Sequence, residues 1–233
     1  SNMKARISYI PDDPFCFLQA DTLEMKRFYS GIYPNFDNEM FTRMQEFFPS
    51  IDLKRNVRRL SRGMQKQVAF WIALCCRPDV LILDEPVDGL DPVMRRQVWN
   101  IILSMVTERH TTVMVSSHNL RELEDICDHV GIMHHGKIML ERSLCDLQSN
   151  ISKIQVAFQE GMPNLPDQFE ILHMSNIGRV YTMIVRGNPK EAAEAIRTEG
   201  DNLAIVDILP LTLEEIFVYE MGGLDYEVKD ILF

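Results

Sequence analysis

The chain has 233 residues and a formal net charge of −10 at pH 7. Because the phosphate backbone of nucleic acids attracts basic surfaces, this acidic balance argues against a nucleic-acid-binding protein. The five cysteines show no repeated pair spacing, which argues against a disulfide framework and favours a reducing compartment. The longest apolar run, residues 68–76, is less than half of the ~20 residues that a membrane span requires, so we expect any membrane role to need a partner chain.

Strand-like and helix-like patterns alternate over the first part of the chain, which is typical of an α/β layer with a mainly parallel sheet. Residues 80–83 are all apolar, as expected of a strand that is buried on both faces. We expect this strand to lie at the centre, between strands over 7–10 and 111–116. The remaining elements predicted in this part are helices over 22–30, 38–48, 61–76, 92–108 and 120–127, with Thr22 capping the first, and a hairpin with strands over 130–133 and 137–140.

The pattern changes near residue 149, after which strands and helices predict a small α+β domain. Its expected elements are a strand over 153–158, a hairpin turning at 176–178, a helix over 189–199, a strand over 203–209 and a last helix that starts with the capping box Thr212–Glu215. We therefore predict a core domain over 1–148, with a helical part at about 20–76, and an accessory domain over 149–233.

Two adjacent carboxylates, Asp84 and Glu85, follow the apolar strand over 80–83. Open α/β sheets bind their ligands at this carboxyl edge. Asp84 is suited to holding the water shell of a nucleotide-bound Mg²⁺, and Glu85 to polarising an attacking water. A strand that ends in an ordinary turn is the alternative, and the neighbouring motifs argue against it.

Three further motifs surround these acids in a fixed order. Leu60-Ser-Arg-Gly-Met64 precedes them at a helix start, Asp88-Gly-Leu-Asp-Pro92 follows them, and His118 ends the next strand. Together they resemble the ATP-binding-cassette (ABC) ATPase family. The first motif is similar to its LSGGQ signature, residues 80–85 to its Walker B strand and catalytic Glu, residues 89–91 to its D-loop, and His118 to its switch histidine.

The resemblance, which covers about residues 7–147, implies a fold like that of the P-loop NTPases and an ATPase that drives transport, with an exporter favoured by the signature variant. It implies catalysis by Glu85 and His118, and Mg²⁺ binding by Asp84 with Asp12. It also implies ATP as cofactor, a transmembrane permease and a second ATP-binding subunit as partners, head-to-tail dimerisation, and a cytoplasmic location on the inner face of the membrane. The residues it implies in nucleotide binding are Ser61, Arg62, Gly63, Met64, Asp12 and Asp91.

The sequence departs from the family pattern at three places. The signature has Arg62 and Met64, and Asp12 stands where the family has its Q-loop glutamine. Residues 131–138 fit G-x-x-x-x-G-K, but Ile138 lacks the hydroxyl that a phosphate loop needs, and Lys137 is expected in a hairpin turn. We therefore expect the phosphate loop to precede Lys4 in the full protein, the sheet to be incomplete with exposed apolar surface, and the 233 residues alone to be inactive.

Alternatives remain for the function and for two groups of side chains. A soluble ABC ATPase unconnected with transport and a non-catalytic ABC-like regulator are the other functional interpretations. Apolar side chains after Asp12 can receive a cytoplasmic helix of the membrane subunit or pack in the core. A zinc site near Cys127 is disfavoured because no second ligand pair is present. The residues concerned are Phe15, Phe17 and Leu18 for the apolar group, and His129, His134 and His135 for the zinc hypothesis.

Overall fold

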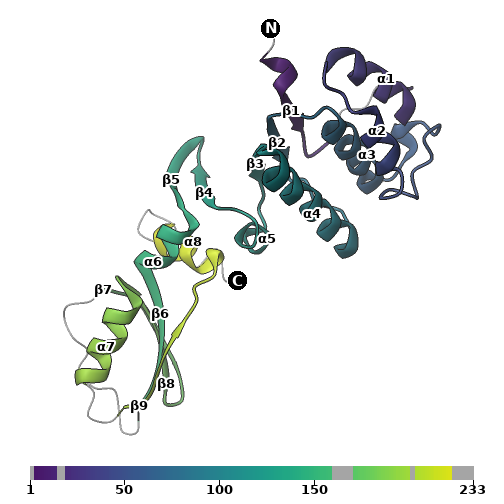
Figure 1. Cartoon of the computed structure of the whole chain (residues 1–233). Coiled ribbons are helices and arrows are strands. Elements are labelled where there is room, and N and C mark those ends of the chain that lie inside the picture. Colours follow the sequence, from purple (N-terminus) through teal and green to yellow (C-terminus); the bar gives the residue numbers. More distant parts are fainter. Residues whose placement is uncertain (1–2, 15–18, 159–169, 200–202, 222–233) are drawn as a thin grey trace. The chain divides into compact units, whose positions relative to one another are not determined.

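The computed structural model describes residues 3–14, 19–158, 170–199 and 203–221. The chain divides into two compact units, Ser1–His118 and Asn119–Phe233 (Figure 1). In the part of the chain that is described, no helix combines the length and the apolar character that crossing a bilayer demands. The apolar group at residues 15–18 lies outside the described residues.

Among its described residues, the first unit contains three strands and four α-helices. The helices begin at capped positions. Asp21, not the predicted Thr22, caps the first of them, because Asp21 and Glu24 form a reciprocal capping box. The elements are β1 (Ile7–Ile10), α1 (Thr22–Ile32), α2 (Asn38–Met44), α3 (Arg62–Cys75), β2 (Val80–Asp84), α4 (Pro92–Arg109) and β3 (Thr112–Ser116).

The three strands form a parallel sheet in the order β1-β2-β3. Ile10 pairs with Leu83, and Leu83 pairs with Val115. The prediction that the strand over 80–83 lies between the other two is therefore confirmed. This register brings the carboxyl ends of all three strands to one edge of the sheet.

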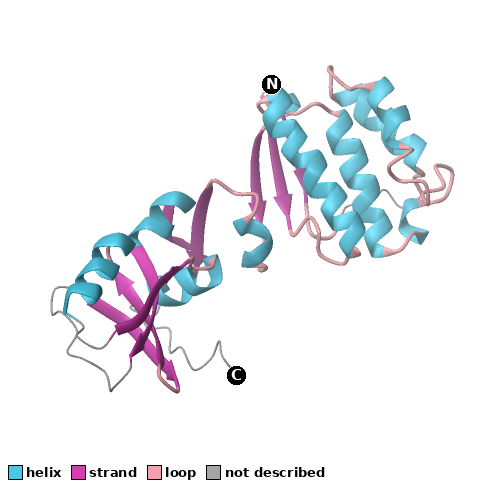
Figure 2. Ribbon diagram, turned by 60° about the horizontal axis from the view of Figure 1, so that its bottom comes forward, coloured by secondary structure: helices cyan, strands magenta, loops and turns pink. Residues whose placement is uncertain are grey.

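The helices cover one face of this sheet (Figure 2). Leu81 and Leu83 are buried on that face, where α3 packs against β1 and α4 packs against β3. On the opposite face Tyr9 is 57% exposed and Met114 is 64% exposed. The expected exposed apolar surface is therefore present along the described strands.

Trp71 anchors the helical part of the first unit. Its side chain is fully buried, and its ring stacks on that of Phe41 with the centroids 4.7 Å apart. The indole Nε1–H donates to the carbonyl oxygen of Phe41 at 2.9 Å. This contact joins α3, which carries the signature-like motif, to α2.

The second unit contains a hairpin, a four-stranded antiparallel sheet and four helices among its described residues. The short helix α6 was not predicted, because its polar sequence has a capped start but little apolar periodicity. The elements are α5 (Leu120–Glu124), β4 (His129–His134), β5 (Lys137–Ser143), α6 (Leu144–Asn150), β6 (Ile151–Phe158), β7 (Glu170–Ile177), β8 (Val180–Arg186), α7 (Pro189–Glu199), β9 (Leu203–Leu209) and α8 (Leu213–Met221).

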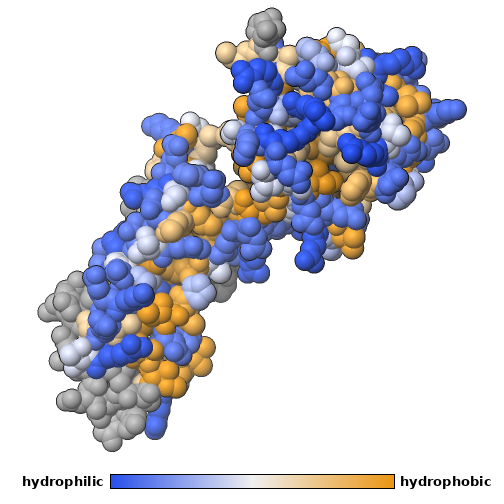
Figure 3. Space-filling view, in the orientation of Figure 1, coloured by the Kyte–Doolittle hydropathy of each residue, from blue (hydrophilic) through white to orange (hydrophobic). Residues whose placement is uncertain are grey.

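The larger sheet of the second unit has the strand order β7-β8-β6-β9. On one of its faces Ile154 and Met183 form a buried cluster with Ala192 and Ile196 of α7. Apolar side chains also reach the surface of this unit (Figure 3). Ile177 of β7, Val180 of β8 and Ile205 of β9 are all exposed. The order of helices and strands agrees with a small α+β fold.

The division between the two compact units falls between residues 118 and 119 of the chain. The domain boundary expected from the sequence is between 148 and 149. That boundary falls inside α6, which packs on both β5 and β6 and so connects the hairpin to the larger sheet. The assignment of 1–148 to an ATPase core and of 149–233 to an accessory domain stays a prediction.

The hairpin of β4 and β5 contains the sequence that fits a phosphate-loop pattern. Gly136, with φ of 73°, forms the turn, and Lys137 opens β5. A phosphate loop leads into a helix, whose N-terminal N–H groups help to hold the anion. This geometry confirms the rejection of residues 131–138 as a phosphate loop.

Candidate functional site

Asp84 and Glu85 lie at the carboxyl edge of the parallel sheet. Asp84 is the last residue of β2, and Glu85 follows it with φ of 45°. The left-handed region costs a residue with a Cβ about 1–2 kcal/mol, so the surroundings must hold Glu85 there. Its N–H donates to the carbonyl oxygen of Ser116 at 3.0 Å, which continues the pairing with β3 past the end of the strand.

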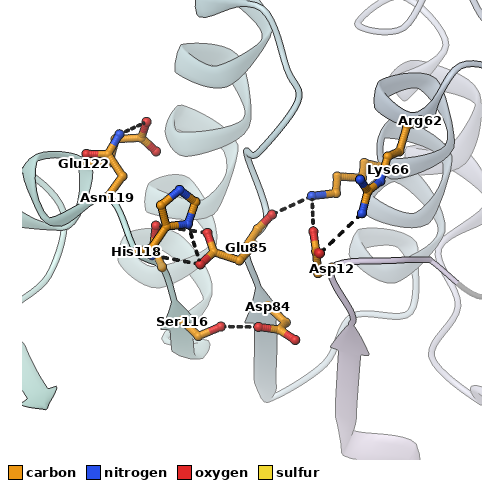
Figure 4. A network of polar contacts seen from close by, with 10 residues as sticks. Asp12, Arg62, Lys66, Asp84, Glu85, Ser116, His118, Asn119 and Glu122 are labelled. Atoms are coloured by element: carbon orange, nitrogen blue, oxygen red, sulfur yellow. Dashed lines mark hydrogen bonds and ion pairs between the residues drawn. The ribbon is translucent and has the colours of Figure 1, made fainter. Parts of the chain in front are cut away.

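The carboxylate of Glu85 is held by the residues that follow β3. Its Oε1 accepts from the backbone N–H of His118 at 2.8 Å and lies 2.9 Å from His118 Nδ1, while Oε2 accepts from Ser117 Oγ at 3.3 Å (Figure 4). The Glu85 side chain is 23% exposed and the His118 side chain is 76% exposed. A fixed carboxylate next to an accessible imidazole is suited to orienting a water molecule.

Asp84 precedes Glu85 in the chain, and its carboxylate has a different partner. The hydroxyl of Ser116, the residue paired with Asp84 across the sheet, donates to Asp84 Oδ1. A carboxylate and a hydroxyl at this edge are hard oxygen donors, which are the donors that Mg²⁺ prefers, so these residues fit a site for that ion.

A buried lysine joins this edge to Asp12. Lys66 Nζ donates at 2.8 Å both to Asp12 Oδ1 and to the backbone carbonyl oxygen of Glu85, and Arg62 lies 3.4 Å from Asp12 Oδ2 (Figure 4). The hydrogen bond from Lys66, together with its charge, holds the pKa of the Asp12 carboxyl below its usual range. Asp12 is thus charged and placed between two cations.

The signature-like motif lies at the start of α3, next to the turn that precedes α4. Ser61 caps α3, since its Oγ accepts from the N–H of Met64 at 3.3 Å, and Asp91 caps α4. A Cβ added to Gly63 would lie 3.2 Å from the carbonyl oxygen of Gly89. The two motifs therefore touch, and they line a cavity of about 900 Å³ whose walls include Ser61, Arg62, Gly63, Met64, Gly89 and Asp91.

The sequence also matches known proteins. Residues 1–88 match the family described as ABC transporter. The chain is 30% identical over 196 residues to "ABC transporter ATP-binding protein YtrB" of Bacillus subtilis, a match that covers 82% of this chain and 65% of the relative. It is 33% identical over 180 residues to "Bacitracin transport ATP-binding protein BcrA" of Bacillus licheniformis, with 74% of this chain and 58% of the relative covered.

The first part of the chain therefore matches the ABC transporter family, and the chain is similar to ABC transporter ATP-binding proteins. It spans less than two thirds of the length of these two relatives. The solved "Structure of ATP binding subunit of ABC transporter" has the same fold, with a TM-score of 0.56 and 24% identity over 62% of each chain.

The ABC-type motifs predicted from the sequence fall into two groups in the first unit. Asp84, Glu85 and His118 meet at the carboxyl edge of the sheet, and Asp12 is connected to this group through Lys66. The signature residues and Asp91 line the cavity at the start of α3. Their roles in binding and catalysis stay predictions.

Sequence reasoning missed Lys66, Ser116 and Ser117. Lys66 lies one turn before the apolar Phe70 and therefore on the same face of α3. A lysine on an apolar helix face was the signal in the sequence that could have identified it. For the two serines no signal was available, because their partners come from a strand that lies 32 residues earlier in the chain. Among the described residues, no three or more His, Cys, Asp or Glu side chains gather as a metal cluster near Cys127 or elsewhere.

Replacing Gly63 by alanine is expected to destabilise the first unit by about 1 kcal/mol. Overpacking against the Gly89 carbonyl costs about 1–3 kcal/mol, and the better helix propensity of alanine offsets up to about 1 kcal/mol of this. Gly31 is the matched control, because a Cβ there meets nothing within 4 Å, and Gly31→Ala is expected to stabilise. Unfolding in urea measures the stability of both variants. If Gly63→Ala stabilises the protein as much as Gly31→Ala does, Gly63 does not lie as close to the Gly89 carbonyl as the structure shows.

Proposed function

We propose that the chain supplies the hydrolytic and signature elements of the ATP-driven motor of an ABC exporter. The observation that carries this proposal is the Glu85 carboxylate, which is held at the carboxyl edge of β2 by hydrogen bonds from His118 and Ser117. Such an arrangement is suited to phosphoryl transfer to water, where catalysis consists mainly of positioning and electrostatic stabilisation.

Each of these side chains has a separate task in the proposed reaction. Glu85 accepts a hydrogen bond from the attacking water and draws its proton away from the oxygen. His118, whose ring is exposed, contacts the γ-phosphate and reports its presence to the loop after β3. Asp84 and Ser116 would hold Mg²⁺, which neutralises charge on the phosphate oxygens when bound.

The signature motif acts on the nucleotide of a second subunit in this proposal. The N-terminus of α3 presents the backbone N–H group of Gly63, and a helix N-terminus favours an anion. Ser61, Arg62 and Asp91 line the same cavity, into which the γ-phosphate held by the partner would project. ATP would thus draw two ATP-binding subunits together head to tail.

The transport role is extended from relatives. BcrA is named for the transport of bacitracin, and the signature with Arg62 and Met64 resembles that of bacterial exporters. We therefore propose that a membrane-spanning permease is the partner and that the chain works on the inner face of the membrane. The permease would convert closure of the dimer into movement of the substrate.

The 233 residues alone are expected to bind Mg-ATP weakly and to show no turnover. Their sequence contains no G-x-x-x-x-G-K-[ST], the loop whose N–H groups and lysine hold the phosphates. Titration with a fluorescent ATP analogue, checked by calorimetry with ATP, measures this affinity. Tight binding by the 233 residues would show that another segment holds the phosphates and would remove this part of the proposal.

The proposed function is tested on a loop-containing form, in which a segment with the sequence G-x-x-x-x-G-K-[ST] precedes these 233 residues. Light scattering should show ATP-dependent dimerisation, and a phosphate-release assay should show turnover. The turnover should also be measured in vesicles with and without a permease. If the protein dimerises and its turnover is the same in both cases, a soluble ABC ATPase is favoured. Binding without any turnover would favour a non-catalytic regulator.

A further inference from the structure

Lys66 is a buried cation in the first turns of α3. Its side chain is only 2% exposed, although lysine is among the residues that are seldom fully buried without a partner. Its ammonium has two oxygen acceptors at 2.8 Å, Asp12 Oδ1 and the backbone carbonyl oxygen of Glu85. A buried charge with these two partners is held in one place.

The carbonyl that Lys66 contacts belongs to the left-handed residue of the site. Glu85 has φ of 45°, and only a surrounding network keeps a residue with a Cβ in that region. On one side of Glu85 its N–H is bonded to Ser116 of β3. On the other side its carbonyl accepts from Lys66 and from the N–H of Asp88.

Lys66 therefore acts on the part of Glu85 that the residues after β3 do not reach. Ser117 and His118 hold the carboxylate, while Lys66 holds the peptide that carries it. Rotation of that peptide out of the left-handed region would swing the Glu85 side chain away from His118. Figure 4 shows Lys66 and His118 on opposite sides of Glu85.

We propose that Lys66 is a positioning residue for Glu85, which it fixes through the main chain and connects to the carboxylate of Asp12. Its importance for hydrolysis rests on the proposed function, but the positioning itself does not. Because Lys66 contacts both groups, a displacement of Asp12 would reach the Glu85 peptide through the Lys66 ammonium. No covalent step is required of Lys66.

Nuclear magnetic resonance on the 233-residue chain tests the positioning directly. In Lys66→Met, which keeps the length of the side chain and removes the charge, the His118 amide proton should lose the downfield shift that its bond to the Glu85 carboxylate gives. Gln67→Met, a similar change at the next position of α3, should leave that resonance where it is in the parent. An unchanged His118 amide in folded Lys66→Met would overturn the proposal.

A measurement on the parent chain covers the case in which Lys66→Met does not fold. The ¹⁵N-detected ammonium protons of Lys66 should exchange with water far more slowly than those of the exposed Lys54, because the former are buried and bonded. Equal exchange rates would overturn the proposal without any variant.

Turnover of the loop-containing form separates the positioning from the proposed function. Misplacement of a catalytic group by about 1 Å can lower a rate about 100-fold, so Lys66→Met should lower kcat by about that factor and leave KM nearly unchanged. If the amide shift is lost but the loop-containing parent has no turnover, the positioning stands and the proposed function fails. If kcat of Lys66→Met is unchanged while the parent is active, Lys66 does not position Glu85 for hydrolysis, and that part of the proposal is wrong.

Discussion

Glu85→Gln is expected to lower ATP turnover by the loop-containing form by about 10²–10⁴-fold. The amide keeps the volume and the approximate shape of the carboxylate, so nucleotide binding should persist. However, a neutral amide draws a proton from water much less strongly than a carboxylate does. ATP-induced dimers, followed by light scattering, should therefore last longer in this variant, while the phosphate-release assay reports the lower rate.

Glu108→Gln is the matched control for this substitution. Glu108 is exposed near the end of α4, so its variant should keep the turnover of the parent. If Glu85→Gln releases phosphate as fast as the parent, Glu85 does not polarise the water, and another group at the carboxyl edge of the sheet must do so.

Trp71→Ala is expected to destabilise the first unit by about 3–5 kcal/mol. The substitution empties a fully buried site and removes both the stacking on Phe41 and the hydrogen bond from the indole N–H. The only other tryptophan, Trp99, is buried in α4, so its fluorescence still reports unfolding of this unit in urea. The midpoint should shift to a much lower urea concentration.

Val93→Ala is the control for Trp71→Ala. Val93 is 67% exposed in the first turn of α4, and its replacement should change stability by no more than about 0.5 kcal/mol. A Trp71→Ala midpoint close to that of Val93→Ala would show that the packing of α2 on α3 contributes little to the stability of this unit.

Local patterns were sufficient to predict most of the elements. The all-apolar residues 80–83 and the β-branched residues 111–116 are typical of strands, and the structure pairs them in the expected order, although only one face of the sheet is buried. The α6 helix and the capping of α1 by Asp21 were missed, because each depends on a short polar segment for which several local conformations are close in energy.

The candidate site was predictable to the extent that it consists of motifs. Asp84 and Glu85 at a strand end, and His118 at the next strand end, were predicted to share one edge, and the parallel register puts them there. The sequence could not indicate which atoms would meet. Ser117 reaches Glu85, and Ser116 reaches Asp84, only because β2 and β3 pair in this particular register.

The sequence by itself was enough to predict the resemblance to the ABC family, the central place of the strand over 80–83, and the carboxylate, imidazole and signature-like residues of the candidate site, since these follow from motifs, composition and spacing. Only the tertiary structure decided how Lys66 is used. A lysine on an apolar helix face can reach outward to water or inward to a partner, and the choice depends on whether a carboxylate and a carbonyl lie within its reach. Here Asp12 and the left-handed peptide of Glu85 are both 2.8 Å away, on segments 54 and 19 residues distant in the chain, so the ammonium stays buried.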